Sequence, residues 1–436
     1  MTEWQEIRLG DVMRIKHGWP FKSECFREWS PGLPIVVSIG NFQYSGGFRF
    51  ESTQLKGYEG DYPKEYKLLP GDTLLVMTCQ TPGGEILGIP GRVPDDGRQY
   101  LHNQRMGKVV VTRPDLVCDD FLYWVFLGKE FNQELVASSS GTKIVHTAPT
   151  RIEAFRFTLP PIDEQRAIAR ILGVLDDKVE LNRRMNRTLE AMAQAIFRAW
   201  FVDFEPVSAK RDGRKPAGMD DATTALFPEH FQDTEMGPVP AGWRKGSTAD
   251  IARYVNGRNF TKNATGSGRM VIRIAELNSG PGSSTIYNEI ESGPENTAFP
   301  GDLLFSWSGS LDVYRWHRDE ALVNQHIFKV VCDEYPLWFV HQHLREAMAF
   351  FQGVAADKAT TMGHIKREHL SQPDVALPPV EILVAAGKII QPIYTRLLKS
   401  ERQALALANL RDALLTKLLS GELRVKSAKK LLESVP

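Results

Sequence analysis

The sequence predicts an α+β protein in which two similar strand-rich globular domains are separated by two long helices packed as an antiparallel coiled coil. Three observations lead to this fold class: an amphipathic stretch of about 40 residues, a later stretch that repeats it, and a strand-rich segment that also occurs twice. A helix of that length is roughly 60 Å long. An apolar stripe along such a helix needs a partner, and the second stretch supplies one.

The first long helix is predicted within 159–206. A proline pair precedes it, and Asp163 and Glu164 fall in its first turn, where the helix dipole favours negative charge. Apolar residues then recur at steps of three and four, which is typical of a helix packed along another helix. These residues are Ile168, Leu172, Leu175, Val179, Leu189, Ala193, Ile196 and Trp200.

The second long helix is predicted within 377–423. It opens with the same Leu-Pro-Pro, at an offset of 377 − 159 = 218, and the apolar pattern continues at that offset. A polar residue interrupts both seams at matched positions, Asn182 and Ser400. Because the first helix leads away from the first globular domain and the second must return toward it, we expect antiparallel packing. Gly387 and Pro392 are expected to kink the second helix or delay its start.

Two globular modules flank the first helix: the first module is 1–158 and the second module is 243–376. Several residues recur 239 positions apart, namely Trp4, Asp11, Gly18 and Phe21 with Trp243, Asp250, Gly257 and Phe260. Pro-Gly-Asp, Asn-Gln and a histidine also recur, at Asp72 and Asp302, Asn103 and Asn324, and His146 and His364. A shared framework with unlike loops is how two recognition modules with different targets should look.

The remaining segments are a connector, 207–242, and a C-terminal tail, 424–436. The connector is rich in proline, glycine and charge, so we expect an irregular surface segment there.

Composition bounds the function. The chain has 436 residues and a formal net charge of zero, which counts mildly against a protein that grips DNA unaided. Its polar, acidic start predicts no signal peptide, and no apolar run approaches the roughly 20 residues that cross a membrane. Four cysteines without paired spacing suggest reduced thiols and a cytoplasmic protein.

Catalytic patterns are missing from the sequence. It contains no glycine-rich loop of the P-loop or dinucleotide type. His341 and His343, two apart, suit a helix surface or a pocket better than a metal site. We therefore expect a non-catalytic protein that binds no metal and no cofactor itself.

Four segments in combination carry a resemblance to a known family: 159–165, 175–184, 200–207 and 235–243. Through them the chain resembles the specificity subunits of type I restriction–modification systems, over nearly its whole length. The second helix departs from the family pattern, because its opening has Glu381-Ile382 where the first has Glu-Gln.

The resemblance implies that each module is a target-recognition domain that reads half of a split, asymmetric site in double-stranded DNA. It also implies that the helical pair sets the gap between the halves and docks two methylation subunits. Those partners would bind S-adenosylmethionine and methylate adenine, and motor-nuclease subunits would join for cleavage.

Candidate DNA-binding residues come from three polar loops in each module and from the residue after each Asn-Gln pair, since base edges and phosphates need donors and cations. In the first module they are Lys16, Lys22, Thr78, Gln80, Thr81, Arg105, Ser139, Thr142, Lys143 and His146. In the second they are Arg258, Asn259, Lys262, Ser306, Ser308, Ser310, His326, Thr361, His364 and Lys366.

Alternatives remain open at this point. Any one candidate can be a solvated loop residue or a turn cap, and the matched His146 and His364 suggest a shared structural task as readily as a DNA contact. Trp200, Phe201 and Phe204 are expected to form packing or partner surface rather than a base-stacking platform. A non-catalytic scaffold that holds proteins with its two modules is the competing function, and a divergent enzyme is a weaker third.

Overall fold

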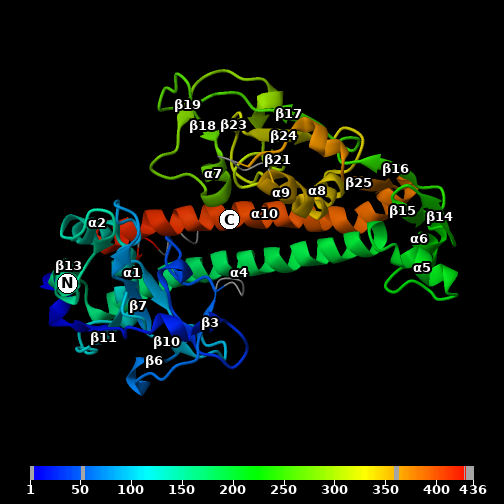
Figure 1. The fold of residues 1–436 in the computed structure, drawn as a ribbon. Coiled ribbons are helices and arrows are strands. Elements are labelled where there is room, and N and C mark those ends of the chain that lie inside the picture. The colour runs from blue at the N-terminus through cyan, green and yellow to red at the C-terminus, as the bar shows by residue number, and fades with distance from the viewer. Residues whose placement is uncertain (1–3, 51–54, 358–362, 427, 429–436) are drawn as a thin grey trace. The chain divides into compact units, whose positions relative to one another are not determined.

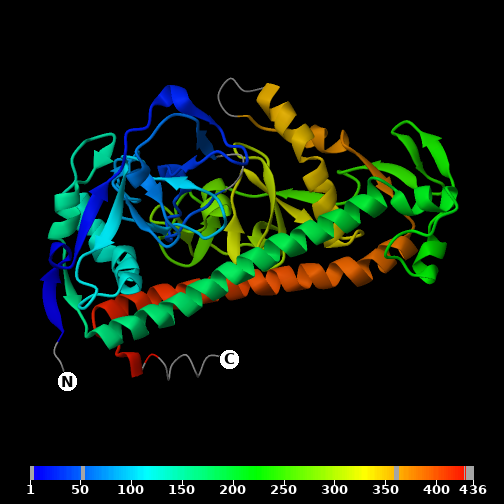
Figure 2. The ribbon, with the colours of Figure 1, turned by 90° about the horizontal axis from the view of Figure 1, so that it is seen from below.

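The computed structural model describes residues 4–50, 55–357, 363–426 and 428. The chain divides into two compact units, and each is described by itself (Figures 1 and 2). Unit 1 comprises 1–178 and 407–436, and unit 2 comprises 179–406. Each unit therefore contains one module and a stretch of both long helices.

The first module is built on two sheets in unit 1. The first has the order β2-β11-β7-β9, with bounds Met13–His17, Met106–Val111, Thr73–Val76 and Pro90–Arg92. The second has the order β3-β5-β4-β10-β6, with bounds Phe26–Glu28, Lys56–Tyr58, Ile35–Val36, Tyr100–Leu101 and Lys67–Leu68. Two-stranded pairings add β1 (Gln5–Arg8) with β13 (Arg156–Leu159), and β8 (Thr78–Cys79) with β12 (Val145–His146). Helices α1 (Asp119–Leu127), α2 (Lys129–Ala137) and α3 (Pro149–Ala154) complete it.

The second module repeats this plan in unit 2. One sheet has the order β17-β24-β21-β22, with bounds Arg253–Asn256, Ile327–Val331, Leu303–Ser306 and Asp312–Arg315. The other has the order β19-β18-β23-β20, with bounds Tyr287–Asn288, Arg269–Ile272, Ala321–Val323 and Thr297–Ala298. β16 (Arg244–Ser247) pairs with β25 (Asp374–Leu377), as β1 does with β13. The helices are α7 (Ile274–Ser279), α8 (Leu337–Glu346) and α9 (Met348–Asp357).

Strand directions confirm that the two modules share one fold. In each, a single parallel pair, β4 with β10 and β18 with β23, lies within an otherwise antiparallel sheet. The three-stranded antiparallel core β2-β11-β7 corresponds to β17-β24-β21. The predicted internal repeat is thus a repeat of structure.

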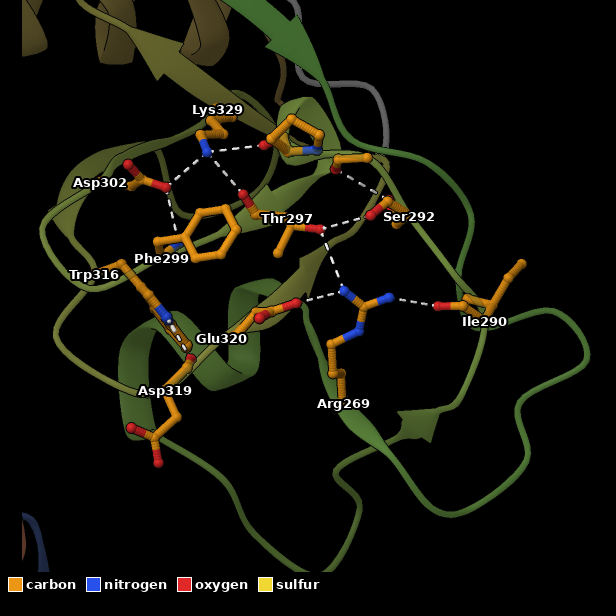
Figure 3. A network of polar contacts seen from close by, with 12 residues as sticks. Arg269, Ile290, Ser292, Thr297, Phe299, Asp302, Trp316, Asp319, Glu320 and Lys329 are labelled. Carbon is orange, nitrogen blue, oxygen red and sulfur yellow. Dashed lines mark hydrogen bonds and ion pairs between the residues drawn. The ribbon is translucent and has the colours of Figure 1, made fainter.

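The Pro-Gly-Asp turn shows how closely the framework repeats. The carboxylates of Asp72 and Asp302 each accept a hydrogen bond at 2.8 Å from the backbone N–H three residues earlier. Each aspartate also pairs with a lysine of the neighbouring strand, Lys108 at 2.6 Å and Lys329 at 2.7 Å. Figure 3 shows that Lys329 additionally meets backbone carbonyls, donating to Thr297 O at 2.7 Å and to Pro294 O at 2.9 Å. The second copy of the turn is therefore held by more bonds.

The two long helices are α4 (Ile162–Phe201) and α10 (Val380–Leu419). In unit 1 the buried faces of both helices share a core that includes Ile168 and Leu172 of α4 with Leu414 and Leu418 of α10. In unit 2 the amide of Asn182 donates to Gln403 Oε1 at 3.4 Å. Early residues of α4 meet late residues of α10 and later ones meet earlier ones, so the predicted antiparallel pairing is confirmed (Figures 1 and 2).

The matched polar positions of the seam are both buried. Asn182 is 2% exposed and Ser400 is 1% exposed. A polar residue in an apolar helix seam costs stability and fixes the register in which the helices pair. Each of the two helices therefore contributes one buried polar residue that helps to fix the register of their pairing.

The start of the second helix differs from the expectation. α10 begins at Val380, so Gly387 and Pro392 lie inside it and do not delay it. Ile382, Ala386 and Ile390 are buried in the core of unit 2 on either side of them. Burial of this face offsets the hydrogen bond that a proline inside a helix cannot make.

The connector was also predicted wrongly, as an irregular surface segment. It contains α5 (Glu205–Arg211), α6 (Asp221–Leu226) and a hairpin of β14 (Phe231–Thr234) with β15 (Gly237–Pro240). Phe227 and Val239 are 1% exposed and pack in the same core as Phe201 and Trp243. Only a few apolar side chains of the connector pack in this core. The polar composition of the rest led to the wrong prediction of an irregular segment. Trp200 and Phe201 are packing residues of this core, as expected.

Candidate nucleic-acid interface

Loops that are far apart in the sequence meet at one edge of the first module. Trp19 N–H donates to His102 O at 2.9 Å, and Met77 N–H donates to Arg105 O at 3.0 Å. Thr147, which directly follows β12, donates its N–H to Met77 O at 3.0 Å and so brings β12 and the loop before it to the same edge. These segments, 17–22, 77–85, 102–106 and 138–147, are called the first loop edge.

The second module repeats the arrangement bond for bond. Arg258 N–H donates to Val323 O at 3.1 Å, Trp307 N–H to His326 O at 3.3 Å, and Ile365 N–H to Trp307 O at 3.0 Å. The segments 257–262, 306–311, 323–327 and 363–367 form the second loop edge. The structure therefore brings together, in each module, the loops that sequence reasoning selected separately.

A glycine crossing holds each loop edge together. A Cβ placed on Gly18 would lie 2.1 Å from Asn103 O, and one on Gly257 would lie 2.1 Å from Asn324 O. Side-chain carbons do not approach backbone atoms this closely, so both positions require glycine. The Gly18 and Gly257 match found in the sequence thus marks a backbone crossing.

The matched histidines occupy matched places. His146 pairs with Thr78 across β12 and β8, and its Nδ1 lies 3.0 Å from the Thr78 hydroxyl. His364 forms a bridge with Ser308, which corresponds to Thr78. Both histidines are exposed. Both histidines therefore pair their backbone with the same loop position, and the ring of His146 also contacts the Thr78 hydroxyl. A DNA contact by either histidine stays a prediction.

Most candidates present their side chains to solvent. The exposed ones are Lys22, Gln80, Thr81, Arg105, Thr142, Lys143, His146, Arg258, Asn259, Lys262, Ser310, His364 and Lys366. Lys16, Ser139 and His326 are half-buried, and Thr78, Ser306 and Ser308 are buried. Thr361 lies outside the described residues.

Several candidates use their polar atoms inside the loops, as Thr78 does with His146. The hydroxyl of Ser306, which is fully buried, donates to Ser310 O at 2.6 Å. The hydroxyl of Ser139 donates to Val136 O at 2.8 Å, and Asn259 Oδ1 accepts from Lys262 N–H at 3.3 Å. These bonds stabilise the turns, so Ser306, Ser139 and Asn259 act as turn-capping residues, the structural alternative to a DNA contact.

A carboxylate that sequence reasoning missed lies at the first loop edge. Glu85 is exposed, and its carboxylate accepts a hydrogen bond from the Thr81 hydroxyl, which lowers the pKa of Glu85. It therefore stays ionised and acts as an acceptor, the property that a cytosine amino group requires. Glu85 was not among the predicted residues, because cations and amides were expected at the loop edge; its position four residues after Thr81 could have indicated it.

The two histidines of α8 belong to the core instead. His341 Nδ1 lies 2.6 Å from the Tyr394 hydroxyl, and His343 packs edge-on against Phe197 and Phe339. Burial lowers the pKa of His343 to about 3 and lowers that of His341 as well. The expectation of a helix surface is corrected, because both side chains are buried, but His341 does line a pocket together with Arg315 and Arg345.

No group of three or more His, Cys, Asp and Glu in the described part of the chain is arranged to hold a metal ion. Among the same residues, no helix combines the length and the apolar character that crossing a membrane requires.

Known proteins resemble the chain in sequence. Residues 1–191 match the family model of the type I restriction modification DNA specificity domain. The MjaIX specificity subunit of Methanocaldococcus jannaschii, a type I restriction enzyme subunit, is 26% identical over 97% of this chain and 94% of its own length. The HindI specificity subunit of Haemophilus influenzae is 22% identical over 97% of this chain and 100% of its own length.

A solved structure has the same fold. The S subunit of a type I restriction–modification system from M. genitalium aligns with a TM-score of 0.54 at 14% identity, covering 96% of each chain.

The fold defines a class of protein with two related modules, whose loop edges share backbone bonds and differ in side chains. The chain resembles the specificity subunits of type I restriction–modification systems along nearly its whole length, and residues 1–191 match their DNA specificity domain. These subunits are the non-catalytic members of such systems.

Proposed function

We propose that each module reads one half of a split, asymmetric site in double-stranded DNA with its loop edge. The observation that carries this proposal is the repeated edge, in which matched backbone bonds support unlike side chains. A common frame gives both modules the same approach to a duplex, and the differing side chains give each its own bases.

A module exchange tests this proposal. Replacing residues 1–155 by the matching segment of a relative with another target should change one half of the recognised site and leave the other half unchanged. Methylated adenines mapped in DNA from cells carrying the hybrid system provide the measurement. A change in both halves, or in neither, would contradict the assignment of one half to each module.

We further propose that α4 and α10 set the gap between the halves. Each helix has 40 residues, and the buried Asn182 and Ser400 fix their register. Inserting one heptad into both helices, at matched positions beside these residues, preserves the seam and lengthens each helix by roughly 10 Å. The gap between the halves should then grow by about three base pairs, since B-DNA rises 3.4 Å per pair. An unchanged gap would refute the ruler.

The partners that this function requires are two methylation subunits, which bind S-adenosylmethionine and methylate adenine, and motor-nuclease subunits for cleavage. The exposed apolar side chains Val174 and Leu181 on α4 and Val384 on α10 offer the helices as a docking surface. With a net charge of zero the chain alone should bind DNA weakly and gain affinity with the methylation subunits, in the cytoplasm.

The competing function is a scaffold that holds proteins with its modules. Sequence-selective protection of DNA by the assembled complex would eliminate it. Binding of partner proteins without a preferred DNA site would favour it over the proposal made here.

A further inference from the structure

We infer that each module reads one guanine with a single arginine, and that the two modules place this arginine at different points of the same frame. The readers are Arg105 in the first module and Arg258 in the second. The inference rests on the proposed function, because it assumes that the loop edges face DNA.

The glycine crossing makes the two positions comparable. Trp19 bridges to Asn103 in the first module, and Arg258 bridges to Asn324 in the second. Two residues after each asparagine stand Arg105 and His326. The frame thus has a position beside the crossing, held by Trp19 or Arg258, and a position after it.

One of these two positions holds a ring and the other an arginine, and the order is opposite in the two modules. Trp19 packs against Tyr66 with ring centroids 5.3 Å apart, and the position after the crossing holds the exposed Arg105. In the second module the order is reversed: Arg258 is exposed beside the crossing, and His326 packs on Trp307 at 5.3 Å. Each edge therefore keeps one ring for packing and offers one guanidinium.

The two guanidinium groups are available. Within the described residues, neither Arg105 nor Arg258 has an ion pair or a side-chain hydrogen bond. Arginines at the far ends of the same strands are engaged, because Arg113 pairs with Asp115 at 2.8 Å and Arg253 with Asp333 at 2.6 Å. Binding a base therefore costs Arg105 and Arg258 no existing ion pair.

Guanidinium chemistry selects the base. A guanidinium presents parallel N–H donors, and guanine offers the acceptors O6 and N7 side by side in the major groove. No other base presents two adjacent acceptors there, so an arginine fixed at a loop base discriminates for guanine. Lysine keeps the charge but lacks the planar fork.

The test uses the chain assembled with its methylation subunits and a pool of DNA duplexes randomised at every position of the two half sites. The variants are Arg105→Lys and Arg258→Lys, and the matched controls are Arg113→Lys and Arg253→Lys on the same strands. Sequencing the methylated fraction gives the base preference at each position. Charge is conserved throughout, so a general loss of attraction to phosphate stays small.

Arg105→Lys should lower the preference for guanine at one position of one half site, by roughly 5- to 150-fold. Arg258→Lys should do the same at one position of the other half, and the controls should leave both halves unchanged. Unaltered preferences, or a uniform fall in methylation across all sequences, would overturn the inference in favour of phosphate contacts. A wild-type half site without guanine on either strand would also overturn it. A wild-type complex that selects no sequence at all would instead defeat the proposed function.

Discussion

The first and second modules use one matched arginine in opposite ways. Strand register makes the match, since Arg92 pairs with Thr73 on β9 and β7, and Arg315 pairs with Leu303 on β22 and β21. Arg92 stays within its own module, where it contacts Asp120 of α1 at 2.7 Å. The side chain of Arg315 instead extends to the two long helices and pairs with a glutamate of each.

The arginine of the second module has a buried side chain and pairs with two glutamates, of which Glu190 is exposed and Glu401 is half-buried. Its guanidinium lies 2.6 Å from Glu190 of α4 and 2.7 Å from Glu401 of α10, and its side chain is 7% exposed. It also lies over the ring of Tyr394 of α10, 5.4 Å from the centroid. One side chain of the second module thus holds both helices of unit 2.

The first module meets the long helices through apolar side chains and through the buried Gln165 of α4, which accepts from Cys118 N–H at 2.9 Å and donates to Leu116 O at 2.8 Å. Phe121 and Trp124 of α1 share a buried core with Leu172 of α4 and Leu414 of α10. Both modules pack apolar side chains against the long helices, and the second module adds an ion cluster around Arg315. A repeated module can therefore keep its sheets and turns while a matched residue makes a different contact.

Removing Arg315 should have the largest effect. Arg315→Ala leaves Glu190 and Glu401 without their cation, and Glu401 is 19% exposed, so unit 2 should lose about 3–5 kcal/mol of stability. Arg92→Ala, whose partners are exposed, should cost at most about 1 kcal/mol in unit 1. Peptide-resolved hydrogen exchange in rising urea measures both units in one chain. Equal losses in the two units would contradict the comparison.

The lysine of the Pro-Gly-Asp turn should give the next largest difference. Lys329→Met leaves Asp302 unpaired and removes the donor to Thr297 O and Pro294 O, so it should cost about 2–3 kcal/mol. Lys108→Met removes the pair with Asp72 alone and should cost about 1 kcal/mol. Urea unfolding of the two variants measures the difference, and the reverse order would show that the extra carbonyl bonds do not stabilise the turn.

The glycine crossing is the shared part and should respond alike in both modules. Gly18→Ala and Gly257→Ala each force a Cβ against a backbone oxygen, and each should cost about 1–3 kcal/mol. The loss should be equal within about 0.5 kcal/mol in the two units, as judged by hydrogen exchange. A large loss in one unit and none in the other would show that the two crossings are not equivalent.

A fall in pH should give the smallest difference in stability between the two units. The pKa of His343 is about 3 in the folded chain, below its ordinary 6.5, because its ring is buried. As pH falls below 6.5 the unfolded chain binds a proton that folded His343 does not, so stability falls by up to about 1.4 kcal/mol per pH unit.

His343→Phe keeps a ring between Phe197 and Phe339 and removes this proton. The drop in the urea midpoint of unit 2 between pH 7 and pH 5 should therefore shrink. His102 of the first module has a pKa of about 4, so unit 1 should keep its own acid sensitivity in this variant. An unchanged drop in unit 2 would contradict the burial of a neutral His343.

The sequence predicted what repetition makes visible. Gly18 and Gly257, Asp72 and Asp302, and the two Leu-Pro-Pro openings all recur at fixed offsets, so the modules, the helices and their pairing followed. Arg105 was predicted to be a reader because its counterpart His326 differs, and this stays a prediction.

The remaining features depend on contacts that spacing does not reveal. Arg315 and Glu401 are 86 residues apart, and their pairing follows no periodic pattern. Ser306 was placed at the interface because it is polar, but its strand position buries it. Phe227 follows Ala225 and Leu226 in a segment rich in proline, glycine and charge, and no periodic pattern there distinguishes the buried Phe227 from the exposed Leu226.

The central claim is that two unlike readers divide one DNA site across a gap of fixed length. Mapping every methylated adenine in DNA from cells that carry the intact system tests it most directly. We expect one asymmetric motif in two parts, with a constant gap and a methylated adenine in each part. A continuous motif, a palindromic one, or methylation without a motif would contradict it.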